Sequence, residues 1–133
     1  MSVLVVLLVA CGHSPTAPSP PVTWTISPTS AVMHEGDVVV FHINSSGPAE
    51  VFPTCYIAHA EGVLWAGELR VANNLEPRPT IGSRPAAPTT GDCTVTLVRL
   101  YQTGRAFLRV VELLGVLPFV ERVNLEAAID VAQ

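Results

Sequence analysis

The chain has 133 residues, a formal net charge of −4 at pH 7 and a hydrophobic fraction of 49%. This length fits one domain, and this much apolar sequence indicates a folded core rather than a disordered chain. The acidic balance and the lack of a basic patch exclude an electrostatic basis for nucleic-acid binding. Lysine is absent, which excludes Schiff-base chemistry and P-loop phosphate binding by lysine.

The chain opens with an apolar run, residues 3–10, that stops at Cys11. About eight apolar residues are too few for a membrane-spanning helix, which needs about twenty, but they suffice for the core of a signal peptide. No Lys or Arg precedes the run. The set "LVAC" (8–11) resembles the lipobox of bacterial lipoproteins. The resemblance implies removal of a signal peptide at residues 1–10 and attachment of lipid to Cys11. A buried N-terminal strand and an uncleaved short anchor are the alternatives.

The segment after Cys11 is rich in proline, serine and small residues, "GHSPTAPSPP". This composition is typical of an extended linker, so residues 11–21 are predicted to tether a folded domain, residues 22–133, to a membrane. In the lipoprotein family, the residue after the lipidated cysteine influences sorting. Gly12 at that position resembles the outer-membrane default. The predicted location is therefore the cell envelope, at an outer membrane, facing the periplasm or the cell surface.

The domain contains short segments of alternating or β-branched apolar residues, separated by turn residues. They predict about seven strands, the first interrupted by Pro28. The predicted bounds are residues 22–27 with 31–33, 37–44, 49–60, 62–71, 93–102, 105–113 and 122–131. Residues 105–114 also fit helical spacing, but the preceding turn and the β-branched content favour a strand. In the last strand, Val123 and every second residue after it form the predicted buried face.

The region between residues 73 and 92 carries four prolines and is predicted to be a long loop without regular structure. Such loops are often functional. Arg70, Arg78 and Arg84 lie in or beside it and are candidates for contact with a partner. The alternative is that these arginines only keep the loop soluble.

Two cysteines, Cys55 and Cys93, are left if Cys11 carries lipid. In an exported chain such a pair favours one disulfide. Free thiols and a metal site that uses His59 are the alternatives, although Cys93 has no histidine nearby.

Together these segments predict an all-β fold, a single antiparallel β-sandwich. The stretch 26–47, with its "SP-x-S" segment and "GD" turn, resembles the first strands of bacterial immunoglobulin-like domains. Cys55, Trp65 and Cys93 follow the Cys-Trp-Cys order of that fold. The tyrosine expected two residues before the second cysteine is missing. Most large aromatic side chains are expected in the core, namely Phe52, Tyr56, Trp24, Trp65 and Tyr101.

No pattern of catalytic residues stands out. No serine lies in a G-x-S-x-G elbow, and a cupredoxin-like copper site would need a His and a Met after Cys93. The sequence therefore predicts a lipid-anchored binding or structural module that is not an enzyme and has no cofactor. Its expected partners are the membrane, through Cys11, and an envelope protein or glycan. The alternative is a small metal-binding protein or hydrolase that uses His42 and His59.

Overall fold

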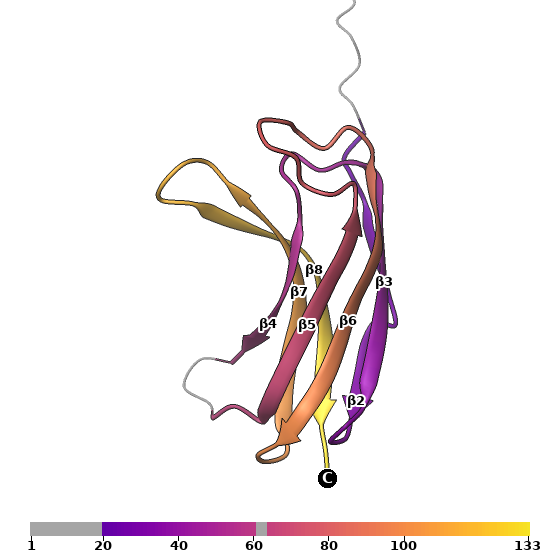
Figure 1. Ribbon diagram of the computed structural model, residues 1–133, viewed down its shortest axis with the longest axis vertical. Helices are drawn as coiled ribbons and strands as arrows, with labels where there is room; N and C mark the ends of the chain where they lie inside the picture. Colours follow the sequence, from indigo (N-terminus) through magenta and orange to yellow (C-terminus); the bar gives the residue numbers. More distant parts are fainter. Residues whose placement is uncertain (1–19, 61–63) are drawn as a thin grey trace, which may run out of the picture.

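The computed structural model describes residues 20–60 and 64–133, which fold as strands and connections with no helix (Figure 1). This confirms the predicted all-β class. The strands are β1 (Trp24–Ser27), β2 (Ser30–Met33), β3 (Val38–Pro48), β4 (Thr54–His59), β5 (Gly67–Glu76), β6 (Pro88–Leu100), β7 (Gly104–Leu114) and β8 (Val120–Val131).

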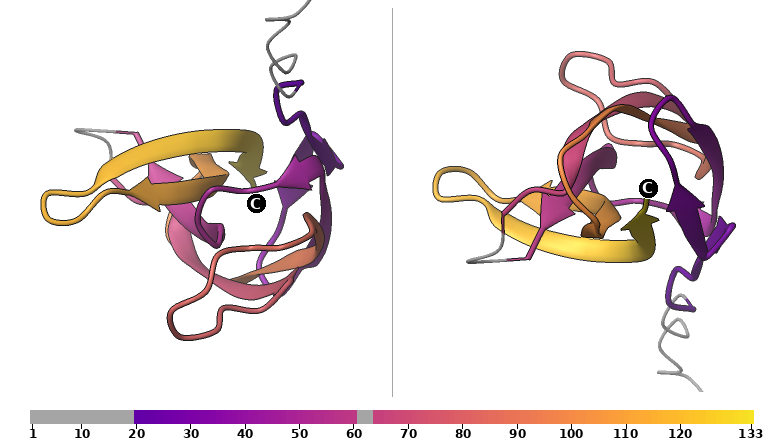
Figure 2. Two further views of the ribbon diagram at one scale, coloured as in Figure 1. Left: turned by 90° about the horizontal axis from the view of Figure 1, so that it is seen from above. Right: turned by 90° about the horizontal axis from the view of Figure 1, so that it is seen from below.

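The strands form two four-stranded sheets, with the orders β1-β3-β6-β5 and β2-β8-β7-β4. The sheets face each other, as the views from the two ends show (Figure 2), so the predicted sandwich is confirmed. One pair corrects the prediction of a purely antiparallel fold, since β2 runs parallel to β8. The cause is that the first predicted strand is interrupted at Pro28. Its first half, β1, pairs with β3 in one sheet, and its second half, β2, continues in the same direction beside β8 in the other sheet.

The sheet order matches the ABED and CFG sheets of constant-type immunoglobulin domains, if β1 is taken as strand A and β8 as strand G. Two features differ from that family. The disulfide joins β4 to β6, whereas immunoglobulin domains join the strands equivalent to β3 and β7, and Trp65 lies outside the strands with 62% of its surface exposed. The immunoglobulin-like assignment therefore stays a prediction.

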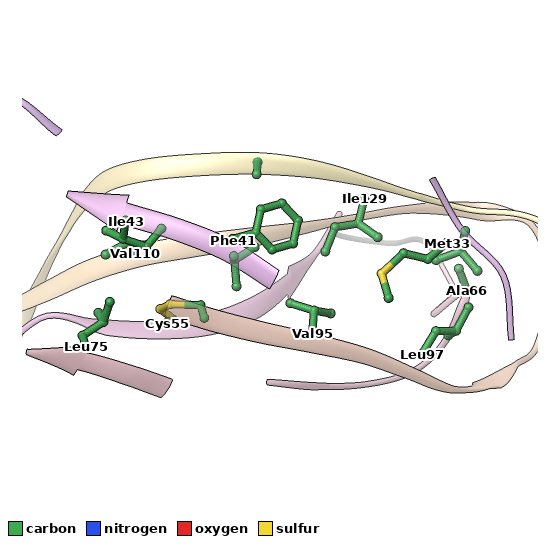
Figure 3. Packing of buried hydrophobic residues seen from close by; sticks show 14 residues of the cluster. Met33, Phe41, Ile43, Cys55, Ala66, Leu75, Val95, Leu97, Val110 and Ile129 are labelled. Carbon is green, nitrogen blue, oxygen red and sulfur yellow. A yellow bond between two sulfur atoms is a disulfide. The ribbon is translucent and has the colours of Figure 1, made fainter. Parts of the chain in front are cut away.

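The core lies between the sheets and is built from alternate residues of the long strands (Figure 3). Phe41 and Ile43 of β3 are fully buried, while His42 between them points outward. In β8, the predicted alternation holds at Ala127, Ile129 and Val131, all buried. Burial of apolar surface, worth about 25 cal/mol per Å², is the main favourable term for such a sandwich.

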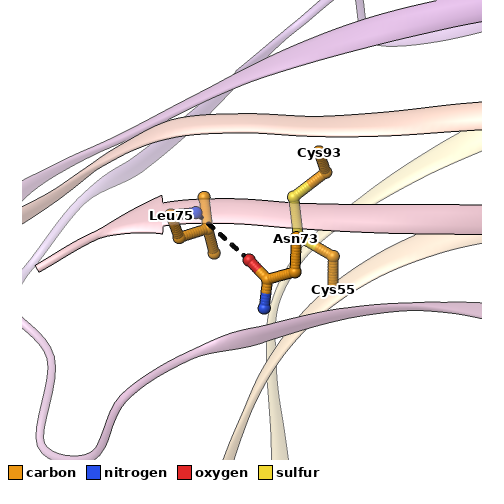
Figure 4. Close-up of a disulfide and its surroundings, with 4 residues drawn as sticks. All are labelled: Cys55, Asn73, Leu75 and Cys93. Carbon is orange, nitrogen blue, oxygen red and sulfur yellow. Dashed lines mark hydrogen bonds between the residues drawn. A yellow bond between two sulfur atoms is a disulfide. The ribbon is translucent and has the colours of Figure 1, made fainter. Parts of the chain in front are cut away.

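The Cys55–Cys93 disulfide crosses the core from β4 to β6 and joins the two sheets (Figure 4). Both cysteines are buried, with 3% and 0% of their surface exposed. Beside them, the backbone N–H of Leu75 donates a hydrogen bond of 3.2 Å to the side-chain oxygen of Asn73. The predicted disulfide is thus present, and it fixes the start of β4 against the middle of β6 in the opposite sheet.

The predicted loop 73–92 is wrong over almost half of its length. β5 continues to Glu76 and pairs with the start of β6, so that only residues 77–87 form the connection. The prolines that suggested a loop lie inside this shorter connection, except Pro88, which is the first residue of β6, where a proline is tolerated. Gly91 makes the close pairing possible, since it has a φ of +131° and any Cβ would collide with the carbonyl oxygen of Asn74.

Other strand bounds also differ from the prediction. β3 extends to Pro48 through a register irregularity, so the "SSGP" segment is part of the strand rather than its end. β4 begins only at Thr54 and β5 at Gly67. The segment 105–114, for which a helix was the alternative, is strand β7 throughout.

Candidate functional site

One end of the sandwich gathers most of the long connections. β3, β5 and β7 all end there, as Figure 1 shows, and we call it the apical end. It contains the first described residues, 20–23, and three connections, at residues 49–53, 77–87 and 115–119. The C-terminus lies at the opposite, basal end.

Near the apical end, the β7–β8 hairpin leaves its sheet and projects sideways from the sandwich (Figures 1 and 2). β4 pairs with β7 only as far as Val111, so the last residues of β7 have β8 as their one neighbour. The turn of this ribbon, residues 113–120, reads "LLGVLPFV" and contains no charged or hydrogen-bonding side chain. We call these eight residues the hairpin tip.

Large apolar side chains of the hairpin tip lie in solvent. Val116 is 87% exposed, Leu117 81% and Val120 65%, and Phe119 and Leu113 are about half exposed, at 52% and 48%. Single exposed apolar residues are ordinary, but a contiguous group marks a surface that contacts another molecule. The hairpin tip is therefore the strongest candidate for a binding surface among the described residues.

A β-bulge turns the ribbon away from the sheet. Val110 pairs with Leu125 and Val111 with Val123, so Asn124 is an extra residue in β8. A bulge bends its strand and increases the local twist, which explains why the hairpin diverges at this point. It also corrects the predicted buried face of the last strand, because Val123 beyond the bulge is 44% exposed.

An ionic cluster fixes the base of the ribbon. Glu112 is only 1% exposed and accepts a hydrogen bond from Arg122, its neighbour across the two strands. Arg122 also contacts Glu50, at 3.1 Å, and so ties the ribbon to the β3–β4 connection. The hydrogen bond to Glu112 is the main reason why the pKa of Arg122 lies above its ordinary value. The ribbon is thus held at its base while its tip stays free.

Two open hollows flank this ribbon. One hollow has a volume of about 490 Å³, and Glu112, Asn124 and Trp24 are among the residues that line it. The second carboxylate oxygen of Glu112 and the side-chain amide nitrogen of Asn124 are buried and have no hydrogen-bond partner in the protein. The other, of about 450 Å³, lies between Arg84 and the first residues of the turn. Its lining is Glu50, Val51, Phe52, Ser83, Arg84, Leu114 and Gly115. The loop predicted to bind a partner therefore borders the same hollow as the hairpin.

The three arginines predicted to meet a partner do not form one site. Arg70 pairs with Glu68 at 2.8 Å and lies six residues before the end of β5, so about 20 Å from the apical end. Arg78 lies in the loop and pairs with Glu76 at 3.3 Å. Only Arg84 borders the hollow beside the hairpin.

His42 and His59 lie on different sheets and have different partners. His42 of β3 is 2.6 Å from the carboxylate of Asp92, on the outer face of its sheet. His59 of β4 stacks on Trp65, with 4.3 Å between ring centroids and 12° between the planes, and burial lowers its pKa. Within residues 20–60 and 64–133, no group of three or more potential metal ligands occurs. The alternative hypothesis of a metal or hydrolase site on these two histidines stays an untested prediction.

The expected burial of the aromatic residues is only partly correct. Trp24, Phe52 and Tyr56 are half-buried, but Trp65 and Tyr101 are 62% and 57% exposed. Both exposed rings lie in connections at the basal end, and next to Trp65 it is the small Ala66 that enters the core. Cys11, the predicted lipid attachment site, lies outside the described residues.

The hairpin tip was not predicted from the sequence, because residues 114–121 were treated only as the connection between the last two predicted strands. The sequence did contain a signal for an exposed apolar surface, because residues 113–120 form a turn without any polar side chain, and turns are usually polar. In the part of the chain that the structure describes, no helix is long and apolar enough to span a bilayer. A comparison of the chain with protein-family models and with curated proteins found no match.

Proposed function

We propose that this protein is a lipid-anchored protein of the bacterial cell envelope, in which the β-sandwich serves as a non-catalytic binding or structural module. The lipid at Cys11 anchors it, and the segment up to residue 21 tethers the folded domain to the membrane. An outer membrane is the proposed location, from the glycine that follows Cys11.

The hairpin tip carries the binding part of the proposal. Exposed apolar side chains cost solubility and contribute nothing to the core, so a group of them on a projecting ribbon supports a role in contact with another molecule. The ionic cluster at the ribbon's base supports the same role, because it holds the tip in a defined place.

The disulfide supports the envelope location. Such bonds persist in oxidising compartments outside the cytoplasm and are rare in cytosolic proteins. It is an argument independent of the lipobox, since neither Cys55 nor Cys93 belongs to the N-terminal segment.

Labelling with a radioactive fatty acid in a bacterial host tests the anchor. The full chain is expected to take up label and to sediment with the membranes, and Cys11→Ser is expected to lose the label. Cys55→Ser is the matched control, because it changes a cysteine outside the lipobox and should keep the label. An unlabelled wild-type chain would refute the anchor.

A further inference from the structure

We propose that the hairpin tip inserts into the surface of the lipid bilayer that holds Cys11, so that the apical end of the domain lies against the membrane. This inference rests on the lipid anchor of the proposed function. It goes further by naming the partner of the exposed apolar side chains, which is lipid rather than protein.

The chemistry of the tip favours lipid. Its eight residues are uncharged, and the glutamate and arginine that follow, Glu121 and Arg122, come only where the ribbon returns towards the domain. Protein interfaces combine an apolar centre with a polar rim and need complementary shapes. The tip instead projects as a narrow ribbon with apolar side chains throughout (Figure 2). A lipid bilayer is fluid and can surround such a ribbon on all sides, so it suits the tip better than a preformed pocket of a protein does.

The position of the tip also favours the bilayer. The described chain begins at Pro20, at the same end of the sandwich as the tip (Figure 1). Pro20 lies nine positions after Cys11 in the chain, and this segment spans about 30 Å when fully extended. The tether therefore keeps the apical end within about 30 Å of the membrane.

The depth of insertion is limited by the structure of the ribbon. The pairing of β7 with β8 ends at Leu114 and Val120, so residues 115–119 within the tip have no partner strand. Apolar side chains of interfacial segments reach about 5–10 Å into the boundary between headgroups and acyl chains, where water still serves the free backbone groups. Ile81 in the neighbouring loop, with its whole side chain exposed, gives the apical end a second apolar contact.

An environment-sensitive fluorophore on the tip tests the inference. The full chain with Val116→Cys is labelled with the dye NBD and reconstituted into phosphatidylcholine vesicles. Cys55 and Cys93 are buried in a disulfide and a lipidated Cys11 is blocked, so only the new thiol reacts. We expect a blue shift of the emission and loss of fluorescence when the lipids carry a quencher. High salt should leave both unchanged, because the tip has no charge.

The matched control is Thr103→Cys at an exposed residue in the basal β6–β7 turn, and a label there should show neither effect. Leu117→Asp added to Val116→Cys should abolish the blue shift.

Three outcomes would contradict the inference or its basis. If the chain floats with the vesicles but labels at residues 116 and 103 behave alike, the tip does not insert and the anchor stands. A blue shift in native membranes that is missing in protein-free vesicles would show a protein partner and overturn the inference. If wild-type protein itself takes a label, Cys11 is free and the anchor fails, whatever the tip does.

Discussion

Glu112 is a nearly inaccessible carboxylate whose protein partner is a single arginine, Arg122. Without that arginine, a buried charge would lose its compensation. We expect Arg122→Met to lower the free energy of unfolding by about 2–4 kcal/mol. Glu50→Gln is the matched control, because Glu50 is 68% exposed at its side chain and its pair should contribute less than about 1 kcal/mol. Urea unfolding measures both, and equal losses would contradict this role of Glu112.

His59 gives the domain a dependence on pH. Burial lowers its pKa in the folded state from the ordinary 6.5, so the folded protein holds the proton less tightly than the unfolded chain. Its contribution to stability is therefore present above pH 6.5 and is lost as the pH falls through the lower folded pKa. A titration of the ring followed by NMR should have its midpoint below 6.5.

Trp65→Ala should move that midpoint up towards 6.5, because it removes the ring stacked on His59. A wild-type midpoint at or above 6.5 would contradict this account. Sequence alone could not predict the pairing of these residues, because the strand prediction gave no reason for two side chains in separate segments to stack.

At the scale of elements, the disulfide holds β4 of one sheet against β6 of the other. With a separation of 38 residues, its loss should cost about 4 kcal/mol on the chain-entropy model. We expect Cys55→Ala with Cys93→Ala to show this loss in urea unfolding, and wild-type protein with a reductant to resemble the double variant. A loss below about 1 kcal/mol would mean that the pairing of the strands alone holds the sheets together.

The hairpin tip is expected to be neutral for stability. Leu117 is 81% exposed, so Leu117→Asp should change the free energy of unfolding by no more than about 0.5 kcal/mol. Leu108 lies in β7 of the same hairpin but is fully buried, and Leu108→Ala should cost about 2–5 kcal/mol. Thermal or urea unfolding under one condition compares them. A large loss for Leu117→Asp would show that the tip packs against the domain.

The period of the sequence predicted most strands because alternation directly reports which face is buried. Ala127 and Ile129 are buried as their spacing indicates, whereas in β3 the spacing left the buried face open, and Val38 and Val40 are exposed although they are apolar. The loop 73–92 was mispredicted because it contains four prolines, while Asn73, Asn74 and Glu76 are polar and still pair with β6. Polar residues at a sheet edge keep their backbone hydrogen bonds, and composition does not reveal this.

The candidate site was less predictable than the fold for a related reason. A run of apolar residues has the same sequence pattern whether its side chains lie in the core or in solvent. The bulge at Asn124 decides between the two for the β7–β8 hairpin, and a bulge depends on the pairing of strands rather than on one segment. Arg84 borders a surface hollow, whereas Arg70 lies far from it because β5 ends later in the chain than predicted. Contact of these arginines with a partner stays a prediction.

For the whole molecule, the two ends of the sandwich differ. The apical end combines the start of the described chain, the hairpin tip and the shortened proline-rich loop, and the C-terminus lies at the other end (Figure 1). The acidic balance of the chain gives no attraction to anionic lipids, so contact with a membrane must come from apolar side chains and from the lipid on Cys11. The central claim is therefore that this lipid is present.

The intact mass of the protein extracted from host membranes shows whether the lipid is present. We expect a chain that begins at Cys11, carries the mass of acyl groups, and lacks the two hydrogens removed by the Cys55–Cys93 bond. With an inhibitor of the lipoprotein signal peptidase, the chain should keep residues 1–10 and carry only the diacylglycerol. An unmodified chain that still begins at Met1 would contradict the anchor, the tether and the membrane contact of the hairpin tip.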